Sequence, residues 1–277
     1  MKGEEDEVIQ KKESSLYKTV VPIEIAGGNL RQFFVYLGSI TRFSGNFFSN
    51  LGSRPIEWTE IRNQCEQIGV SSMPIASITL LFVGFVFAFQ FGFTLRTMGA
   101  VPYIGNVASL SILRELGPVF TALVVGGRVG AGMAAELGSM RVTEQIDAMR
   151  ALGANPYKKL LVPRILAATF MLPIVSLAAS IIGIFGAMII AWLEFNLSPV
   201  AFYKSTIRTI DFGDFWSGFF KPFFFGFGIA LIGCYHGFHC ELGTAGVGKT
   251  TTKAVVNVSL MIVFVDFLLT RIFSLIW

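Results

Sequence analysis

Long apolar runs, separated by shorter polar segments, dominate the pattern of this chain. The run from Pro74 to Leu95 contains no charged residue. At about 1.5 Å per residue, it is long enough to cross roughly 30 Å of hydrocarbon. Four further apolar runs follow it, so we predict five membrane-spanning helices. The predicted spans cover residues 74–95, 115–135, 165–193, 215–235 and 254–276.

The segments outside these spans are more polar. Residues 1–22 are rich in charge, and we predict a disordered tail without a cleavable signal. Residues 23–70 interleave aromatic and polar positions, which favours amphipathic helices lying at the membrane interface. We predict loops at 96–113 and 194–214. The expected fold is an all-α integral membrane protein with an N-terminal interfacial helix, five spans and a cytoplasmic coupling helix between the second and third spans.

Composition and charge narrow the function classes. Hydrophobic residues make up 53% of the chain and charged residues only 14%, which excludes an ordinary soluble domain. The net charge of +4 comes from scattered basic residues, so nucleic-acid binding is not expected. Lys and Arg are denser in 137–164 than in the loops on either side of it. By the positive-inside rule, this segment and the N-terminus face the cytoplasm.

Small residues recur every fourth position along the second predicted span. A strip of this kind allows the backbone of a neighbouring helix to approach closely. The neighbour could be another span of the same chain or a second subunit. The strip consists of Ala122, Gly126, Gly130, Ala134 and Gly138.

Charged residues also occur within or beside the spans, notably Arg114, Arg128 and Asp266. A charge in the bilayer costs at least about 2.5 kcal/mol on insertion scales, so these side chains must face protein, water or headgroups. Two interpretations remain open for them. They are either structural ion-pairing and capping groups, or they contact a charged lipid headgroup.

The polar segment 139–155 is predicted to form a helix outside the membrane. Thr143 suits an N-cap, Glu144 suits the first turn and Gly153 suits the C-terminal cap, followed by Pro156. One face is apolar, so the helix could lie on the membrane or dock in a groove of a partner protein. The candidate docking residues are Val142, Thr143, Glu144, Ile146, Asp147, Met149 and Arg150.

Two motifs suggest chemistry but lack the context for it. Gly243–Thr250 fits the phosphate-loop pattern G-x-x-x-x-G-K-[ST], yet no strand is predicted before it, so we expect a glycine-rich turn. Residues 234–240 hold two cysteines and two histidines, at a spacing that matches no common zinc site. We therefore predict no metal site, and the spans offer no nucleophile–base pair for catalysis.

Several short motifs are distinctive in combination. They are Arg114-Glu-Leu-Gly-Pro118, Gly127-Arg-Val-Gly-Ala131, Ala135-Glu-Leu-Gly138, Val142-Thr-Glu-Gln-Ile-Asp-Ala148, Gly246-Val-Gly248 and Thr250-Thr-Thr-Lys-Ala-Val-Val256. Together they resemble the MlaE/YrbE permease family, and the resemblance runs from about Arg31 to the C-terminus. The family carries a similar turn where the phosphate-loop pattern occurs. The chain departs from the family in its longer, more acidic tail and in Lys249, where arginine is commoner.

The resemblance implies a non-catalytic, homodimeric ABC transporter permease in a bacterial inner membrane, with residues 23–277 as the permease domain. It implies phospholipid as the cargo, moved between the inner and outer membranes. The expected partners are an ATPase subunit that binds ATP and Mg, a periplasmic MCE-domain protein and in some systems a STAS-domain protein. No cofactor is expected in this chain itself. The alternative is a membrane scaffold that recruits cytoplasmic proteins without transporting anything.

Overall fold

The computed structural model describes residues 34–52 and 58–276, and no strand occurs among them. The predicted tail, 1–22, and the first part of the predicted interfacial region, 23–33, lie outside the described residues. The chain divides into two compact units after Asn46. Residues 34–51 are helical, and Thr41 Oγ1 donates a hydrogen bond to the Leu37 carbonyl in this helix. Its location at the membrane interface stays a prediction.

Within the described residues, five helical segments are long and apolar enough to cross a membrane. They are Trp58–Thr97, Val101–Val142, Tyr157–Phe195, Phe212–Phe238 and Thr244–Leu275. The prediction of an all-α membrane protein with five spans is therefore confirmed. Each segment extends beyond the span predicted for it at one end or both, because polar residues continue several of the helices past their apolar parts.

The first of these segments consists of α2 (Trp58–Ile68), a 3₁₀ turn (Val70–Ser72) and α3 (Met73–Thr97), and its long apolar run lies in α3. The polar helix α2 packs on α7. The helical segment therefore begins well before the uncharged run that predicted the first span. The third span is a π-helical turn (Tyr157–Leu161) followed by α7 (Val162–Phe195), which continues through Pro173. A Cβ at Gly84 of α3 would collide with the Gly183 carbonyl of α7, so the two helices are in backbone contact there.

The prediction of a loop at 96–113 is wrong, because most of these residues are helical. Residues from Val101 form a 3₁₀ turn (Val101–Tyr103), α4 (Ile104–Ser111), a π-helical turn (Ile112–Leu116) and α5 (Gly117–Val142). Gly105 does not break the helix, because it faces α8. A Cβ at Gly105 would lie 2.9 Å from the Phe202 carbonyl oxygen. The glycine is explained by close helix packing, a tertiary contact that composition does not reveal.

The loop predicted at 194–214 was also wrong, because it contains α8 (Pro199–Thr209). Ser198 caps this helix by accepting a hydrogen bond from the Ala201 amide at 3.2 Å, and Pro199 occupies the first turn. α9 (Phe212–Phe238) begins with a reciprocal capping box between Asp211 and Asp214. α10 (Thr244–Ile276) completes the chain.

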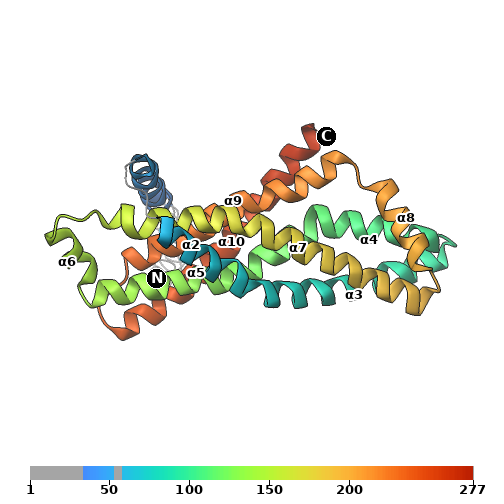
Figure 1. The fold of residues 1–277 in the computed structure, drawn as a ribbon, viewed down its shortest axis with the longest axis horizontal. Coiled ribbons are helices and arrows are strands. Elements are labelled where there is room, and N and C mark those ends of the chain that lie inside the picture. The colour runs from blue at the N-terminus through green and yellow to red at the C-terminus, as the bar shows by residue number, and fades with distance from the viewer. Residues whose placement is uncertain (1–33, 53–57, 277) are drawn as a thin grey trace, which may run out of the picture. The chain divides into compact units, whose positions relative to one another are not determined.

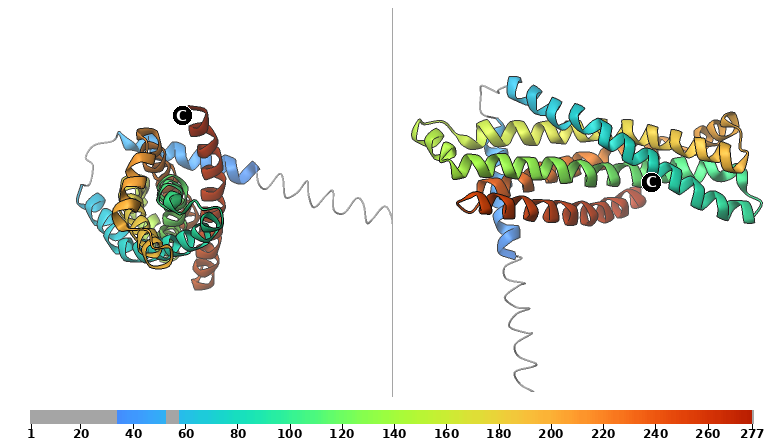
Figure 2. Two further views of the ribbon diagram at one scale, coloured as in Figure 1. Left: turned by 90° about the vertical axis from the view of Figure 1, so that its right-hand side faces the viewer. Right: turned by 90° about the horizontal axis from the view of Figure 1, so that it is seen from below.

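In the second unit, α5 packs against α9 and α10, while α7 lies between α3 and α9. α6 (Gln145–Ala151), which joins α5 to the third span, lies at one end of this bundle. α4 and α8 pack together at the opposite end (Figure 1). Figure 2 shows α5 and α10 running side by side along the bundle. α5 thus connects the interior of the bundle to α6.

Candidate functional site

A buried lysine organises the charged groups in the interior of the bundle. Lys221 of α9 has a side chain with no exposed surface, and its ammonium contacts Glu115 Oε2. The same ammonium donates to Thr270 Oγ1 at 2.8 Å and to the Arg114 carbonyl at 3.3 Å, and it lies 3.4 Å from Asp266 Oδ1. Thr270 in turn donates to Glu115 Oε2 at 3.1 Å. The network therefore joins α9, α10 and the π-helical turn before α5.

A close backbone contact brings Lys221 to these partners. Gly218 lies about one turn earlier on α9, and a Cβ there would collide with the Leu113 carbonyl in the π-helical turn. The absence of a side chain at 218 allows α9 to approach this turn, so Lys221 faces Glu115. Pro222, next to the lysine, lies inside the helix, where it removes one backbone donor.

A second ion pair extends this network toward the start of α9. Arg114 Nη1 lies 3.2 Å from Asp214 Oδ1, and Arg114 Nε lies 3.8 Å from Glu115 Oε1. A buried charge that loses its partner is strongly destabilising, commonly by about 3–5 kcal/mol. The five charged side chains therefore act as one structural unit. Of the predicted charged residues, Arg114 and Asp266 belong to this unit.

Arg128 lies apart from that network, on the surface of α5 that faces α2. Its Nη1 donates to Ser72 Oγ at 2.7 Å and to the Gln67 carbonyl at 3.3 Å, at the junction between α2 and α3. Arg128 does not pair with Asp266, which lies beside Lys221. Arg128 instead caps the end of α2, where backbone carbonyls lack helical partners.

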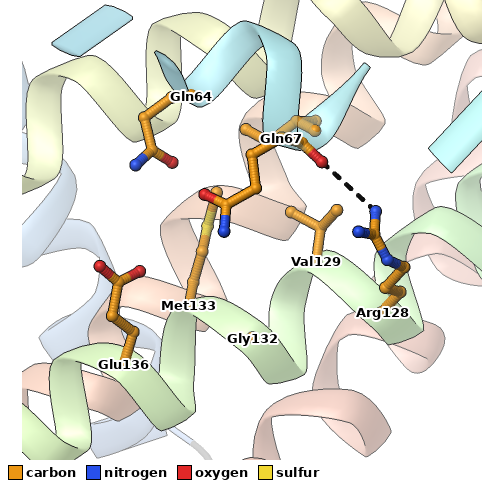
Figure 3. A pocket seen from close by; sticks show the side chains of 8 residues that line it. Gln64, Gln67, Arg128, Val129, Gly132, Met133 and Glu136 are labelled. Carbon is orange, nitrogen blue, oxygen red and sulfur yellow. Dashed lines mark hydrogen bonds between the residues drawn. The ribbon is translucent and has the colours of Figure 1, made fainter. Parts of the chain in front are cut away.

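Next to Arg128 is a cavity of about 380 Å³ between α2 and α5. In Figure 3, Gln64 and Gln67 project into it from α2, whereas Arg128 and Glu136 project from α5. Glu136 Oε1 accepts a hydrogen bond from Arg164 Nη2 at 2.7 Å. Arg164, on α7, is almost fully buried, with 3% of its side chain exposed.

The strip of small residues on α5 packs within the chain. A Cβ at Gly126 would lie 3.1 Å from side-chain atoms of Ile229 and Val258, on α9 and α10. One at Gly130 would lie 3.2 Å from Val258. Ala122 and Ala134 are fully buried, and Gly138 faces Cys240. The strip thus allows three helices of one chain to pack closely.

The polar segment after α5 is divided differently from the prediction. α5 runs through Val142, and α6 covers only Gln145–Ala151. Thr143 is not the N-cap, because its hydroxyl donates back to the Ser139 carbonyl at 2.9 Å. Glu144 occupies that position with a left-handed φ of 58°. The predicted C-terminal glycine is confirmed, since Gly153 has a φ of 75°.

The candidate docking residues lie on and beside α6. Ile146 is buried and anchors the helix to the bundle. Asp147 and Arg150 form an exposed ion pair at 2.8 Å. Leu152, the residue directly after α6, is 86% exposed. α6 therefore presents both charged and apolar side chains at the end of the bundle.

The phosphate-loop pattern lies in a turn and a helix. Gly243 has a φ of 98°, and the residues from Thr244 onward are the first turns of α10. Lys249 pairs with Glu241, with Nζ 3.2 Å from Oε2. No strand precedes the pattern within the described residues, so the fold that a phosphate loop requires is missing there.

The two cysteines and two histidines of 234–240 have separate neighbours. His236 Nε2 lies 2.9 Å from Asn257, His239 Nδ1 lies 2.8 Å from the Tyr235 carbonyl, and Thr250 Oγ1 donates to Cys240 Sγ. Cys234 is fully buried. In the described part of the chain, no three His, Cys, Asp or Glu side chains gather as metal ligands would.

Sequence reasoning missed two of the central residues. Lys221 lies in the fourth predicted span, and an intramembrane lysine is a signal of the same kind as Asp266. Arg164 was assigned to the polar segment, but its side chain is buried against α5. Arg164 directly precedes a long apolar run, and this position could have suggested that it is buried beside an acidic partner, here Glu136.

Comparison with known proteins agrees with this architecture. The family model described as Permease MlaE matches residues 61–272. A Rickettsia typhi protein named "Probable ABC transporter permease protein" is 36% identical over 90% of this chain and 96% of that one. The chloroplastic protein TRIGALACTOSYLDIACYLGLYCEROL 1 of Arabidopsis thaliana is 34% identical over 85% of this chain and 67% of its own.

A third relative carries a more specific name. The intermembrane phospholipid transport system permease protein MlaE of Haemophilus influenzae is 32% identical over 76% of this chain and 80% of that one. The family model covers all five candidate spans, at least in part. The chain is thus a multi-pass membrane protein of the ABC transporter permease type, and it belongs to the MlaE permease family.

Proposed function

We propose that this chain is the membrane subunit of a transporter that moves phospholipids between the inner and outer membranes of a bacterium. The observation that carries the proposal is the continuity of α5. This helix begins at the charged network around Lys221 and ends at α6, which is exposed at the end of the bundle. A movement of α6 would therefore reach the interior of the bundle through one rigid element.

The energy for this movement would come from a separate ATPase subunit. α6 offers a docking surface of suitable character, because Glu144, Asp147 and Arg150 are exposed and Ile146 fixes the helix to the bundle. ATP and Mg would bind to the ATPase alone. The chain itself would hydrolyse nothing and would provide the path for the lipid.

The wider assembly is part of the same proposal. Two copies of the chain would form the transporter, in complex with a periplasmic MCE-domain protein and in some systems a STAS-domain protein. The basic segment 137–164 and the N-terminus would face the cytoplasm, where the ATPase is. The name of the Haemophilus relative supports phospholipid as the cargo.

Charge reversal on α6 tests the proposal. The double variant Glu144→Lys and Asp147→Lys should insert and fold but fail to co-purify with the ATPase, because both residues lie on the exposed surface. Glu194→Lys is the control, since it reverses an exposed charge at the end of α7. Normal assembly of the double variant would contradict the proposal.

A second measurement separates a transporter from a scaffold. The purified complex should contain phospholipid and should move it between donor and acceptor vesicles when ATP is added. A scaffold would recruit its partners through the same helix α6 but would show no lipid transfer dependent on ATP.

A further inference from the structure

The cavity between α2 and α5 combines two opposite charges with amide groups. Arg128 lies at one end and Glu136 at the other, while Gln64 and Gln67 line the side formed by α2 (Figure 3). Its volume of about 380 Å³ is within the range of small-ligand pockets. None of these groups is part of the network around Lys221.

Both charged residues keep hydrogen-bonding capacity for a ligand. Arg128 uses only Nη1 for its contacts with Ser72 and Gln67, so Nε and Nη2 have no partner among the residues that the structure describes. Glu136 binds Arg164 through Oε1, which leaves Oε2 unused within the same residues. The cavity therefore presents donors at one end and an acceptor at the other.

The two charges come from separate turns of one helix. Arg128 and Glu136 are eight residues apart on α5, so their backbone positions differ by about 12 Å along the helix axis. A ligand that contacts both must therefore present an anionic group to Arg128 and a hydrogen-bond donor to Glu136. A phosphate linked to a primary ammonium by a short chain has both groups.

The polarity of α2 favours a position of the cavity at the level of the headgroups. Its sequence, WTEIRNQCEQI, carries charged or amide side chains at more than half of its positions. Such a helix does not lie in hydrocarbon, because every polar group there needs a partner. A cavity beside α2 is thus within reach of a lipid headgroup whose acyl chains remain along the apolar part of the bundle.

We propose that this cavity binds the headgroup of a phosphatidylethanolamine-type lipid. Arg128 binds the phosphate through its free guanidinium donors, and Glu136 accepts a hydrogen bond from the primary ammonium. The carboxamides of Gln64 and Gln67 line the link between them. The inference deepens the proposed function, on which it rests, by naming the substrate class and an entry site in one protomer.

Gly132 supplies a variant that fills the cavity. It lines the cavity, and a Cβ at this position would meet no atom within 4 Å. Gly132→Leu should therefore fold while its side chain occupies the headgroup space. Gly127→Leu is the matched control, because Gly127 also lies on α5, has equal room and does not line the cavity.

The test measures binding of short-chain lipids to the full-length protein in detergent by titration calorimetry. Dihexanoyl phosphatidylethanolamine should bind, and the choline analogue should bind about tenfold more weakly because its ammonium has no N–H donor. Gly132→Leu and Arg128→Met should each lose at least tenfold, whereas Gly127→Leu should not. Equal binding of both lipids, or no effect of Gly132→Leu, would overturn the proposal.

Two further measurements separate the possible sources of a signal. Inorganic phosphate that binds as tightly as the lipid would identify a free-anion site and refute the headgroup assignment. If the complex transports lipid but this cavity binds no ethanolamine lipid, the headgroup site is refuted and the proposed function stands. If the cavity binds the lipid but the complex shows no ATP-driven transport, the proposed function is refuted and the binding site stands.

Discussion

The ammonium of Lys221 contacts the carboxylate of Glu115, although the two residues come from different spans and the lysine side chain is completely buried. Asp266 and Thr270, on α10, complete the surroundings of the lysine. Three helical segments are thus connected by one cation. This arrangement makes the packing of α5, α9 and α10 depend on a single charge.

Lys221→Met should strongly destabilise the protein. Methionine has a similar length but leaves Glu115 and Asp266 without their cation, and loss of one partner of a buried pair costs about 3–5 kcal/mol. Thermal unfolding of the purified protein in a mild detergent measures the effect.

The neutral triple variant Glu115→Gln, Lys221→Met, Asp266→Asn is the control for charge. It should recover much of the lost stability, since no unpaired charge remains. If the triple variant is as unstable as Lys221→Met alone, the lysine acts through its packing and not through its charge.

Packed and open glycines on α5 should differ in how a larger side chain changes the stability of the protein. At Gly126, even a Cβ would lie 3.1 Å from side-chain atoms of Ile229 and Val258, so Gly126→Leu overpacks this contact. Overpacking of this kind costs about 1–3 kcal/mol. Gly127→Leu enters open space and replaces a poor helix former. Unfolding temperatures of the two variants compare them directly, and equal losses would contradict the packing described for α5.

The left-handed residue between α5 and α6 predicts an unusual substitution effect. Glu144 adopts a φ of 58°, which costs a residue with a side chain about 1–2 kcal/mol. Glu144→Gly should therefore maintain or raise thermal stability, whereas the β-branched Glu144→Val should lower it. Limited proteolysis at 143–145 should show the same ranking, with the glycine variant cleaved more slowly than the valine variant. Greater resistance in the valine variant would refute this account of the turn.

Lys249→Ala should leave nucleotide binding by the complete transporter unchanged. Lys249 lies in α10 and pairs on the surface with Glu241, a contact worth about 0–1 kcal/mol. Photolabelling with an azido-ATP analogue shows which chain is labelled and how strongly. The control Glu241→Ala removes the same ion pair from the other side. Loss of labelling in Lys249→Ala alone would mean that the phosphate-loop pattern binds nucleotide.

The sequence was sufficient to predict the five spans, because each contains a long run of apolar residues. It was not sufficient for α4 and α8, which are short and contain turn-forming or polar residues. Gly105 appeared to be a loop residue, yet its role is to contact α8. Ser198 and Pro199, in contrast, are a recognisable helix start that was overlooked.

For the candidate site, sequence reasoning found the charged residues but not their partners. Arg114 and Asp266 share one network only because Lys221 lies between their helices, and helix adjacency cannot be read from one sequence. Arg128 caps α2 through its contact with the Gln67 carbonyl, 61 positions away in the sequence. Gly153, which ends its own helix, was predicted correctly, whereas the start of α6 was not, because the Thr143 hydroxyl bonds back to the Ser139 carbonyl.

The π-helical turn at Ile112–Leu116 also determines the rotational phase between α4 and α5. A π turn holds about one residue more than an α turn. Deleting one residue from it would restore an α-helix and rotate α4 by about 100° relative to α5. Gly105 would then turn away from α8, and Arg114 or Glu115 from the lysine. A single-residue deletion here should thus be more harmful than many substitutions, because it changes the phase of a whole helix and so displaces several contacts at once.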